Sequence, residues 1–155
     1  MKKRELRTKD NYTEKEIYAF LLIKEIEFEK VTYYALESEF GKKHLLVKEF
    51  YADYDLAIGK KINCYVDKIN CAGEIFLEPI HPYYKLNQIY SFKVLREGTK
   101  NIKGLVDYGV FFESKYKTEL FLPTSREKAK ELLNQEVVNL KLIRIKKGEF
   151  YTELV

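Results

Sequence analysis

Two aromatic residues, Tyr108 and Phe111, lie three positions apart on either side of Gly109. Exposed rings can stack on unpaired nucleic-acid bases, and neighbouring cations can hold the phosphates. Alternation along a strand points Phe111 away from the core, and Tyr108, just before a bend expected at Gly109, is predicted to share that outer face. The alternative is that both rings only pack. The predicted nucleic-acid-binding residues are Tyr108, Phe111, Lys93, Lys103, Arg144 and Lys146.

The residues that could support metal binding or nucleophilic catalysis are few. Cys64 and Cys71 are not spaced as Cys-x-x-Cys, and His44 and His81 are not spaced as His-x3-His. Cys64 falls on the apolar side of a predicted strand, where a buried thiol is expected, whereas Cys71 lies in a turn. No glycine-rich loop that could cradle phosphates is present. The sequence therefore predicts no metal, no cofactor and no enzymatic activity.

These residues lie in a sequence that contains an internal repeat. The motif Ile-Tyr-Ala-Phe at residues 17–20 returns as Ile-Tyr-Ser-Phe at residues 89–92, which is 72 positions later. Each copy continues with the same order of aromatic-rich, short apolar and long alternating segments. Self-similarity at this period indicates two copies of one small β-rich module.

Each copy is expected to contain five strands. In the first copy the apolar pattern predicts strands at residues 17–26, 31–38, 43–47, 61–69 and 74–78. In the second it predicts strands at 89–96, 102–114 (interrupted at Gly109), 119–122, 136–146 and 149–154. A capping box with Thr124 as N-cap and Glu127 at the third position predicts a short helix before the fourth strand.

Five strands with a helix or turn between the third and fourth is the order of the OB-fold, a small closed Greek-key barrel. We therefore expect an all-β protein of two tandem five-stranded OB-fold barrels. The expected limits are a basic N-terminal arm at 1–14, a first and diverged module at 15–80, a proline-containing linker at 81–88 and a second module at 89–155.

The second module resembles the S1 family of RNA-binding OB-fold domains. The resemblance rests on residues 104–112, Gly-Leu-Val-Asp-Tyr-Gly-Val-Phe-Phe, and on the later corner at 121–125, Phe-Leu-Pro-Thr-Ser. It departs from the family pattern in the spacing between Gly104 and Tyr108 and in Pro123, where many members place a histidine. The tandem arrangement is similar to uncharacterised bacterial S1-like proteins. The resemblance implies single-stranded RNA as a ligand and gives Tyr108 and Phe111 the stacking roles.

The first copy is a weaker match. When residues 33–38 are aligned with residues 109–114, Ala35 stands where Phe111 stands, and the glycine is missing. The partners expected are thus single-stranded RNA or DNA for the second module. The alternative function is an accessory module whose barrels contact another protein, with the first module as the contact.

Composition sets broad limits. The chain has 155 residues, of which 46% are hydrophobic and 34% charged, and a net charge of +4, which permits a nucleic-acid partner without requiring one. No apolar run approaches the roughly 18 residues of a membrane span. The charged start indicates no secretory signal, and two cysteines are too few for a disulfide-stapled fold. We expect a cytoplasmic protein without a membrane segment.

Overall fold

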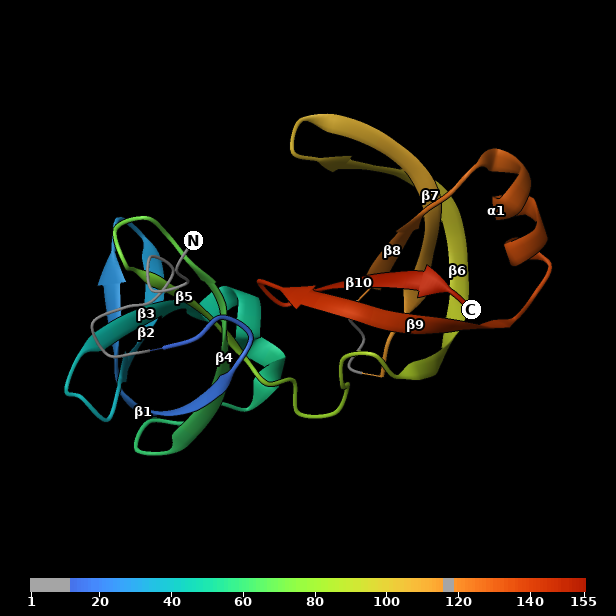
Figure 1. Cartoon of the computed structure of the whole chain (residues 1–155). Helices are drawn as coiled ribbons and strands as arrows, with labels where there is room; N and C mark the ends of the chain where they lie inside the picture. The colour runs from blue at the N-terminus through green and yellow to red at the C-terminus, as the bar shows by residue number, and fades with distance from the viewer. Residues whose placement is uncertain (1–11, 116–118) are drawn as a thin grey trace. The chain divides into compact units, whose positions relative to one another are not determined.

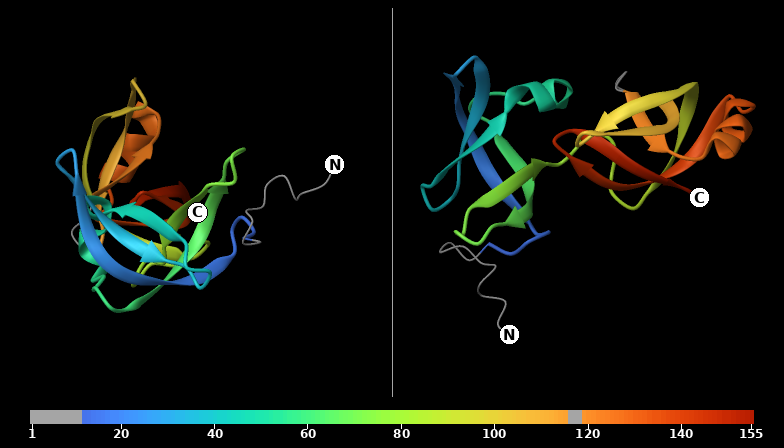
Figure 2. Two further views of the ribbon diagram at one scale, coloured as in Figure 1. Left: turned by 90° about the vertical axis from the view of Figure 1, so that its left-hand side faces the viewer. Right: turned by 90° about the horizontal axis from the view of Figure 1, so that it is seen from above.

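Aromatic and β-branched residues form two sets of five antiparallel strands in the part of the chain that is described. The structure is a computed structural model and describes residues 12–115 and 119–155. The backbone divides between Tyr83 and Tyr84 into two units. We call them unit 1 (Met1–Tyr83) and unit 2 (Tyr84–Val155), and each has its own curled sheet (Figure 1, Figure 2).

Unit 1 is built around its first strand. Its elements are β1 (Ile17–Phe28), β2 (Val31–Glu37), β3 (Lys43–Val47), the 3-10 helix η2 (Lys48–Tyr54), β4 (Lys61–Ile69) and β5 (Ile75–Pro79). The sheet order is β3-β2-β1-β4-β5. The first part of β1 pairs with β4 and the second with β2. A register shift between Leu22 and Lys24 marks a β-bulge, which lets the strand bend.

Unit 2 repeats this plan. Its elements are β6 (Ile89–Ile102), β7 (Leu105–Glu113), β8 (Glu119–Pro123), the helix α1 (Arg126–Leu133), β9 (Val137–Lys146) and β10 (Glu149–Leu154). The sheet order is β10-β9-β6-β7-β8. The bulge in β6 lies between Val94 and Arg96, 72 positions after the bulge in β1. The helix or turn predicted between the third and fourth strands is therefore present in both units.

Closure into barrels, which the sequence predicted, is not observed. Among the described residues no hydrogen-bonded ladder joins β3 to β5 or β8 to β10, so each sheet keeps two edge strands. The edges β8 and β10 nevertheless run close to one another. The strong curl, rather than a closed ladder, encloses each core.

The two cores use equivalent residues. Tyr12 and Phe20 are buried in unit 1, and Tyr84 and Phe92 are buried in unit 2, with 72 positions between the members of each pair. The Tyr12 ring meets Tyr18 edge-on at 4.7 Å, and the equivalent Tyr84 ring meets Tyr90 at 4.8 Å. The repeat therefore begins at Tyr12 and Tyr84, earlier than the shared motif suggested.

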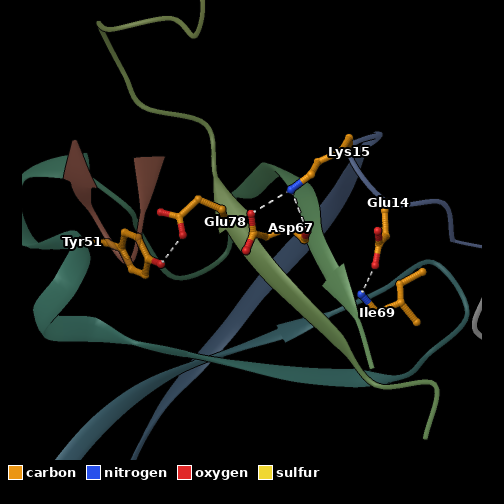
Figure 3. A network of polar contacts seen from close by, with 6 residues as sticks. All are labelled: Glu14, Lys15, Tyr51, Asp67, Ile69 and Glu78. Atoms are coloured by element: carbon orange, nitrogen blue, oxygen red, sulfur yellow. Dashed lines mark hydrogen bonds and ion pairs between the residues drawn. The ribbon is translucent and has the colours of Figure 1, made fainter. Parts of the chain in front are cut away.

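Residues just before β1 are tied to the sheet of unit 1, as Figure 3 shows. The Glu14 carboxylate accepts a hydrogen bond of 2.8 Å from the backbone N–H of Ile69. The Lys15 ammonium lies 3.2 Å from the Asp67 carboxylate. Of the predicted arm at 1–14, Tyr12 and Glu14 thus contact unit 1, and residues 1–11 lie outside the described residues.

Two local predictions need correction. The N-cap of α1 is Ser125, whose Oγ accepts a 3.1 Å hydrogen bond from the backbone N–H of Lys128, not Thr124. The strand pairs β6–β7 and β7–β8 run through Gly109 without a register shift, so no interruption occurs there. The bend comes instead from the bulge in β6, since two residues on that strand oppose one on β7.

Candidate nucleic-acid interface

The ring of Phe111 lies in a row of three side chains on the outer face of unit 2. Val110 and Phe112, its neighbours on β7, are fully buried and point into the core, so alternation points Phe111 outward. In register, Phe111 is opposite Arg96 on β6 and Phe121 on β8. The Arg96 guanidinium carbon is 4.4 Å from the centroid of the Phe111 ring, and the Phe121 ring is 4.9 Å away.

Arg96 is held in place from its other side by a carboxylate. Its two terminal nitrogens donate hydrogen bonds of 3.1 and 2.8 Å to the two oxygens of Glu119. These bonds raise the pKa of Arg96 and lower the pKa of Glu119, so both groups stay charged. The Arg96 side chain is 54% exposed. A planar cation therefore lies over an aromatic ring with much of its surface open to solvent.

A second row, next to the first, is nearly free of side chains. Gly98 on β6, Gly109 on β7 and Pro123 on β8 are opposite one another. A Cβ on Gly98 would be 3.2 Å from the Phe111 ring, and one on Gly109 would be 2.1 Å from the carbonyl oxygen of Leu122. Close approach of the backbone therefore requires a glycine at position 109, whereas a side chain at position 98 would press on the Phe111 ring.

Tyr108 lies on the opposite side of β7. It is half-buried, and its ring packs at the margin of the unit 2 core. The Arg126 guanidinium at the start of α1 is 4.2 Å from the ring centroid, and the hydroxyl donates a hydrogen bond to Glu97. That hydrogen bond is the main cause of the raised pKa of Tyr108, and desolvation of the hydroxyl is the second cause. Tyr108 and Phe111 do not share a face, contrary to the expectation.

The four predicted cations are spread over the unit. Lys93 is exposed on β6, opposite Glu113. Lys103 is exposed at the tip of the β6–β7 hairpin, where it and Gly104 have φ values of 52° and 83°. Arg144 is on β9 opposite Tyr151, and Lys146 is opposite Glu149 at the next hairpin. Only Lys93 lies on the same face as Phe111 and close to it in register.

The charge around the Phe111 ring is balanced. Lys93 and Arg96 bring two positive charges to this face, and Glu113 and Glu119, opposite one another on β7 and β8, bring two negative charges. The chemistry that this surface offers is stacking on a ring and a guanidinium plane, with little net attraction for a polyanion.

Arg96, Phe121 and Arg126 were not predicted as site residues. The pairing of Phe111 with Arg96 depends on the β6–β7 register, which in turn depends on the bulge at Leu95, and the pairing with Phe121 depends on the β7–β8 register. No residue type in that segment predicts a bulge, because leucine, as at Leu95, is common in regular strands. Arg126 could have been noticed as the first helical residue of α1, although its contact with Tyr108 required the position of the helix.

No other candidate site of a different chemistry emerges from residues 12–115 and 119–155. These residues contain no group of three or more His, Cys, Asp or Glu side chains that could hold a metal ion. Cys64 is buried, as predicted, and Cys71 is exposed. None of the helices in these ranges has the length and apolar character needed to cross a bilayer. Comparison with family models, with curated proteins and with solved structures finds no match to this chain.

Proposed function

We propose that this protein is a non-enzymatic, S1-like nucleic-acid-binding protein that binds single-stranded RNA, in preference to single-stranded DNA, on the outer face of unit 2. The observation that carries the proposal is the exposed Arg96 guanidinium over the half-buried Phe111 ring, which packs in turn on the buried Phe121 ring, with the two glycines beside them. Unpaired bases stack on aromatic rings and on arginine planes. The cytoplasm stays the expected location.

The OB-fold interpretation belongs to this proposal. The strand order and the helical segment between the third and fourth strands are those of an OB-fold, which can be a partly open barrel. In that fold the second and third strands carry the binding surface. In unit 2 these strands are β7 and β8, which supply the half-buried Phe111 and the buried Phe121 against which it packs.

The geometry changes the roles proposed for individual residues. The exposed Arg96 plane offers the outer stacking surface, and the half-buried Phe111 ring beneath it supports that plane. Lys93 is the best-placed predicted cation for a neighbouring phosphate. Tyr108, Lys103, Arg144 and Lys146 remain proposed contacts only for a strand that continues beyond this face.

The test is binding of a fluorescent single-stranded RNA of about ten nucleotides to the full chain at two salt concentrations. Phe111→Ala should weaken binding by roughly tenfold to a hundredfold, which corresponds to about 1–3 kcal/mol for one stacked base. Phe111→Leu keeps an apolar side chain without the ring and should weaken binding as well. Lys93→Ala should mainly flatten the salt dependence, because fewer counterions are released.

The matched control is Leu45→Ala in unit 1, since Leu45 is the counterpart of Phe121 in the strand register. It should leave RNA binding unchanged. A folded Phe111→Ala protein that binds RNA like the wild type would contradict the proposal, as would a wild type that binds no single strand at low salt. A matched DNA of the same sequence tests the preference for RNA.

A second candidate function is contact with another protein through unit 1. It is favoured by the charge balance around Phe111, which gives unit 2 little attraction for phosphates, and by the different outer face of unit 1.

A further inference from the structure

The outer face of unit 1 has aliphatic side chains where unit 2 has rings. The row that corresponds to Arg96, Phe111 and Phe121 is Lys24 on β1, Ala35 on β2 and Leu45 on β3. Leu45 is 55% exposed, although its neighbours Leu46 and Leu36 are buried in the core. The next row is Ile26, Tyr33 and Val47, all half-buried. Ala35 offers no surface on which a base could stack.

This face carries an excess of positive charge. Lys24 and Lys43 are exposed, and neither forms an ion pair with any of the described residues. Lys43 is opposite Glu37, the one acidic side chain in its row, and the next strands along that row contribute Leu21 and Lys61. In unit 2 the position of Lys43 is occupied by Glu119. An acidic partner therefore complements unit 1.

The strand that bears Leu45 is also an edge of its sheet. β3 pairs with β2 on one side and is the last strand in the order β3-β2-β1-β4-β5. An edge strand presents backbone N–H and C=O groups that can pair with an added strand, and alternate side chains of that strand lie beside those of the edge. On the outer face those neighbours are Lys43, Leu45 and Val47.

We propose that β3 of unit 1 binds an extended acidic peptide by strand addition. An added antiparallel strand, read from its N-terminus, passes Val47, then Leu45, then Lys43. The peptide that fits this order reads apolar-x-apolar-x-acidic, because two apolar side chains cover Val47 and Leu45 and a carboxylate pairs with Lys43. Nucleic acid cannot form the backbone ladder, so an edge that no strand of the described residues covers favours a peptide.

The experiment uses the full chain and a labelled peptide of about nine residues with Ile-Thr-Val-Thr-Glu at its centre. A second peptide has lysine in place of that glutamate. The wild type should bind the glutamate peptide more tightly in fluorescence anisotropy. Lys43→Glu should weaken that binding by about fivefold or more, because the new carboxylate repels the glutamate of the peptide. It should improve binding of the lysine peptide, because the same carboxylate attracts the lysine. Leu45→Thr should weaken binding by about threefold or more.

The controls separate this site from the nucleic-acid interface. Leu105→Thr alters a leucine of unit 2 that is even more exposed than Leu45 (74% against 55%) and should change nothing. Phe111→Ala should bind the peptide normally, whether or not it binds RNA. A peptide methylated on alternate backbone nitrogens, those that would face β3, should not bind, which tests strand addition without altering the protein. When the unmethylated peptide is bound to the wild type, hydrogen exchange at the backbone amides of β3 should be slower than in the free protein.

Several results would overturn the proposal. These are no saturable binding of the glutamate peptide by the wild type, equal binding of both peptides, or full binding of the methylated peptide. Loss of RNA binding in Lys43→Glu with normal RNA binding in Phe111→Ala would assign this face to nucleic acid instead.

Discussion

Unit 1 and unit 2 share their interior and differ on their outer face. The Tyr18 hydroxyl accepts a hydrogen bond of 2.9 Å from the N–H of Thr13, and the equivalent Tyr90 hydroxyl accepts one of 2.8 Å from Lys85. On the outside, by contrast, Phe111 is replaced by Ala35. The core and its hydrogen bonds therefore define the module, whereas the outer face is free to define the ligand.

Position 109 shows how far this difference extends. Gly109 is opposite Pro123 in unit 2, and its counterpart Tyr33 is opposite Val47 in unit 1. Unit 2 therefore has no room for a side chain at Gly109, whereas unit 1 carries a large side chain, Tyr33, at the equivalent position. The glycine allows β7 and β8 to approach closely around Phe111 and Phe121, whose rings unit 1 lacks.

The largest effect is expected for Gly109→Ala. Its Cβ would lie 2.1 Å from the Leu122 carbonyl oxygen and 2.8 Å from the Phe121 ring, so the strand must move. We expect the free energy of unfolding of unit 2 to fall by about 3 kcal/mol, at the upper end of overpacking effects. Urea denaturation measures it. Tyr33→Ala at the equivalent position should cost less, and equal costs would contradict the comparison.

The second prediction concerns pH, because both histidines of the chain are in unit 1. Burial lowers the pKa of His81 to about 4, outweighing the opposite effect of Asp53, and its ring is 4.9 Å from Tyr54. The unfolded chain binds this proton near pH 6.5, before the folded state does. The stability of unit 1 is therefore full above about pH 6.5 and decreases as the pH falls toward 4.

Between pH 7 and pH 5 this decrease should be about 1–2 kcal/mol. Denaturation curves at the two pH values measure it, and His81→Gln should reduce the difference. Unit 2, which has no histidine, should show the smaller change over this interval. A decrease that is the same with and without His81 would assign the effect to carboxylates instead.

A third prediction uses the helical segments. Ser125 caps α1 through its side chain, whereas Val47, at the N-cap of η2, forms no such bond. Ser125→Ala should lower the stability of unit 2 by about 1 kcal/mol in urea denaturation. Thr124→Ala, at the neighbouring position, should have a much smaller effect. The reverse order would mean that Thr124 is the cap after all.

Sequence periodicity predicted most of the fold. The predicted strands at 43–47, 61–69 and 149–154 coincide with β3, β4 and β10. What it missed depends on long-range geometry. β6 continues to Ile102 because its second half pairs with β7, and residues such as Thr99 and Lys100 show no apolar alternation on their own. Closure also could not be predicted, because strand order leaves the distance between the edge strands undetermined.

The candidate site was predicted in part. Alternation placed Phe111 outward because Val110 and Phe112 are apolar on either side. The same rule, applied without a bend, would have placed Tyr108 on the core side. The assumption of a bend at Gly109 caused the error, since a glycine in a strand can serve close approach as well as a bulge.

The smallest effect is expected where the two units hold similar contacts between a cation and a ring. Arg126 lies 4.2 Å from the Tyr108 ring, and Lys48 lies 5.9 Å from the Tyr34 ring. In unit 2 the Tyr108 hydroxyl donates a hydrogen bond to Glu97, and in unit 1 the Lys48 ammonium donates one to Glu25. The two glutamates are 72 positions apart. Each contact joins the segment after the third strand to the first hairpin of its unit.

Arg126→Ala should lower the stability of unit 2 by about 0.5–1 kcal/mol, since a guanidinium at close range interacts well with a tyrosine face. Lys48→Ala should have a smaller effect on unit 1, because the ammonium is farther from its ring and solvated. Urea denaturation of both variants measures the difference, with Lys130→Ala on the exposed side of α1 as control. If Arg126→Ala also weakens RNA binding while the protein remains folded, Tyr108 and Arg126 belong to the nucleic-acid interface. If it leaves RNA binding unchanged, the contact between Arg126 and Tyr108 serves to hold α1 against the β6–β7 hairpin and is not part of the interface.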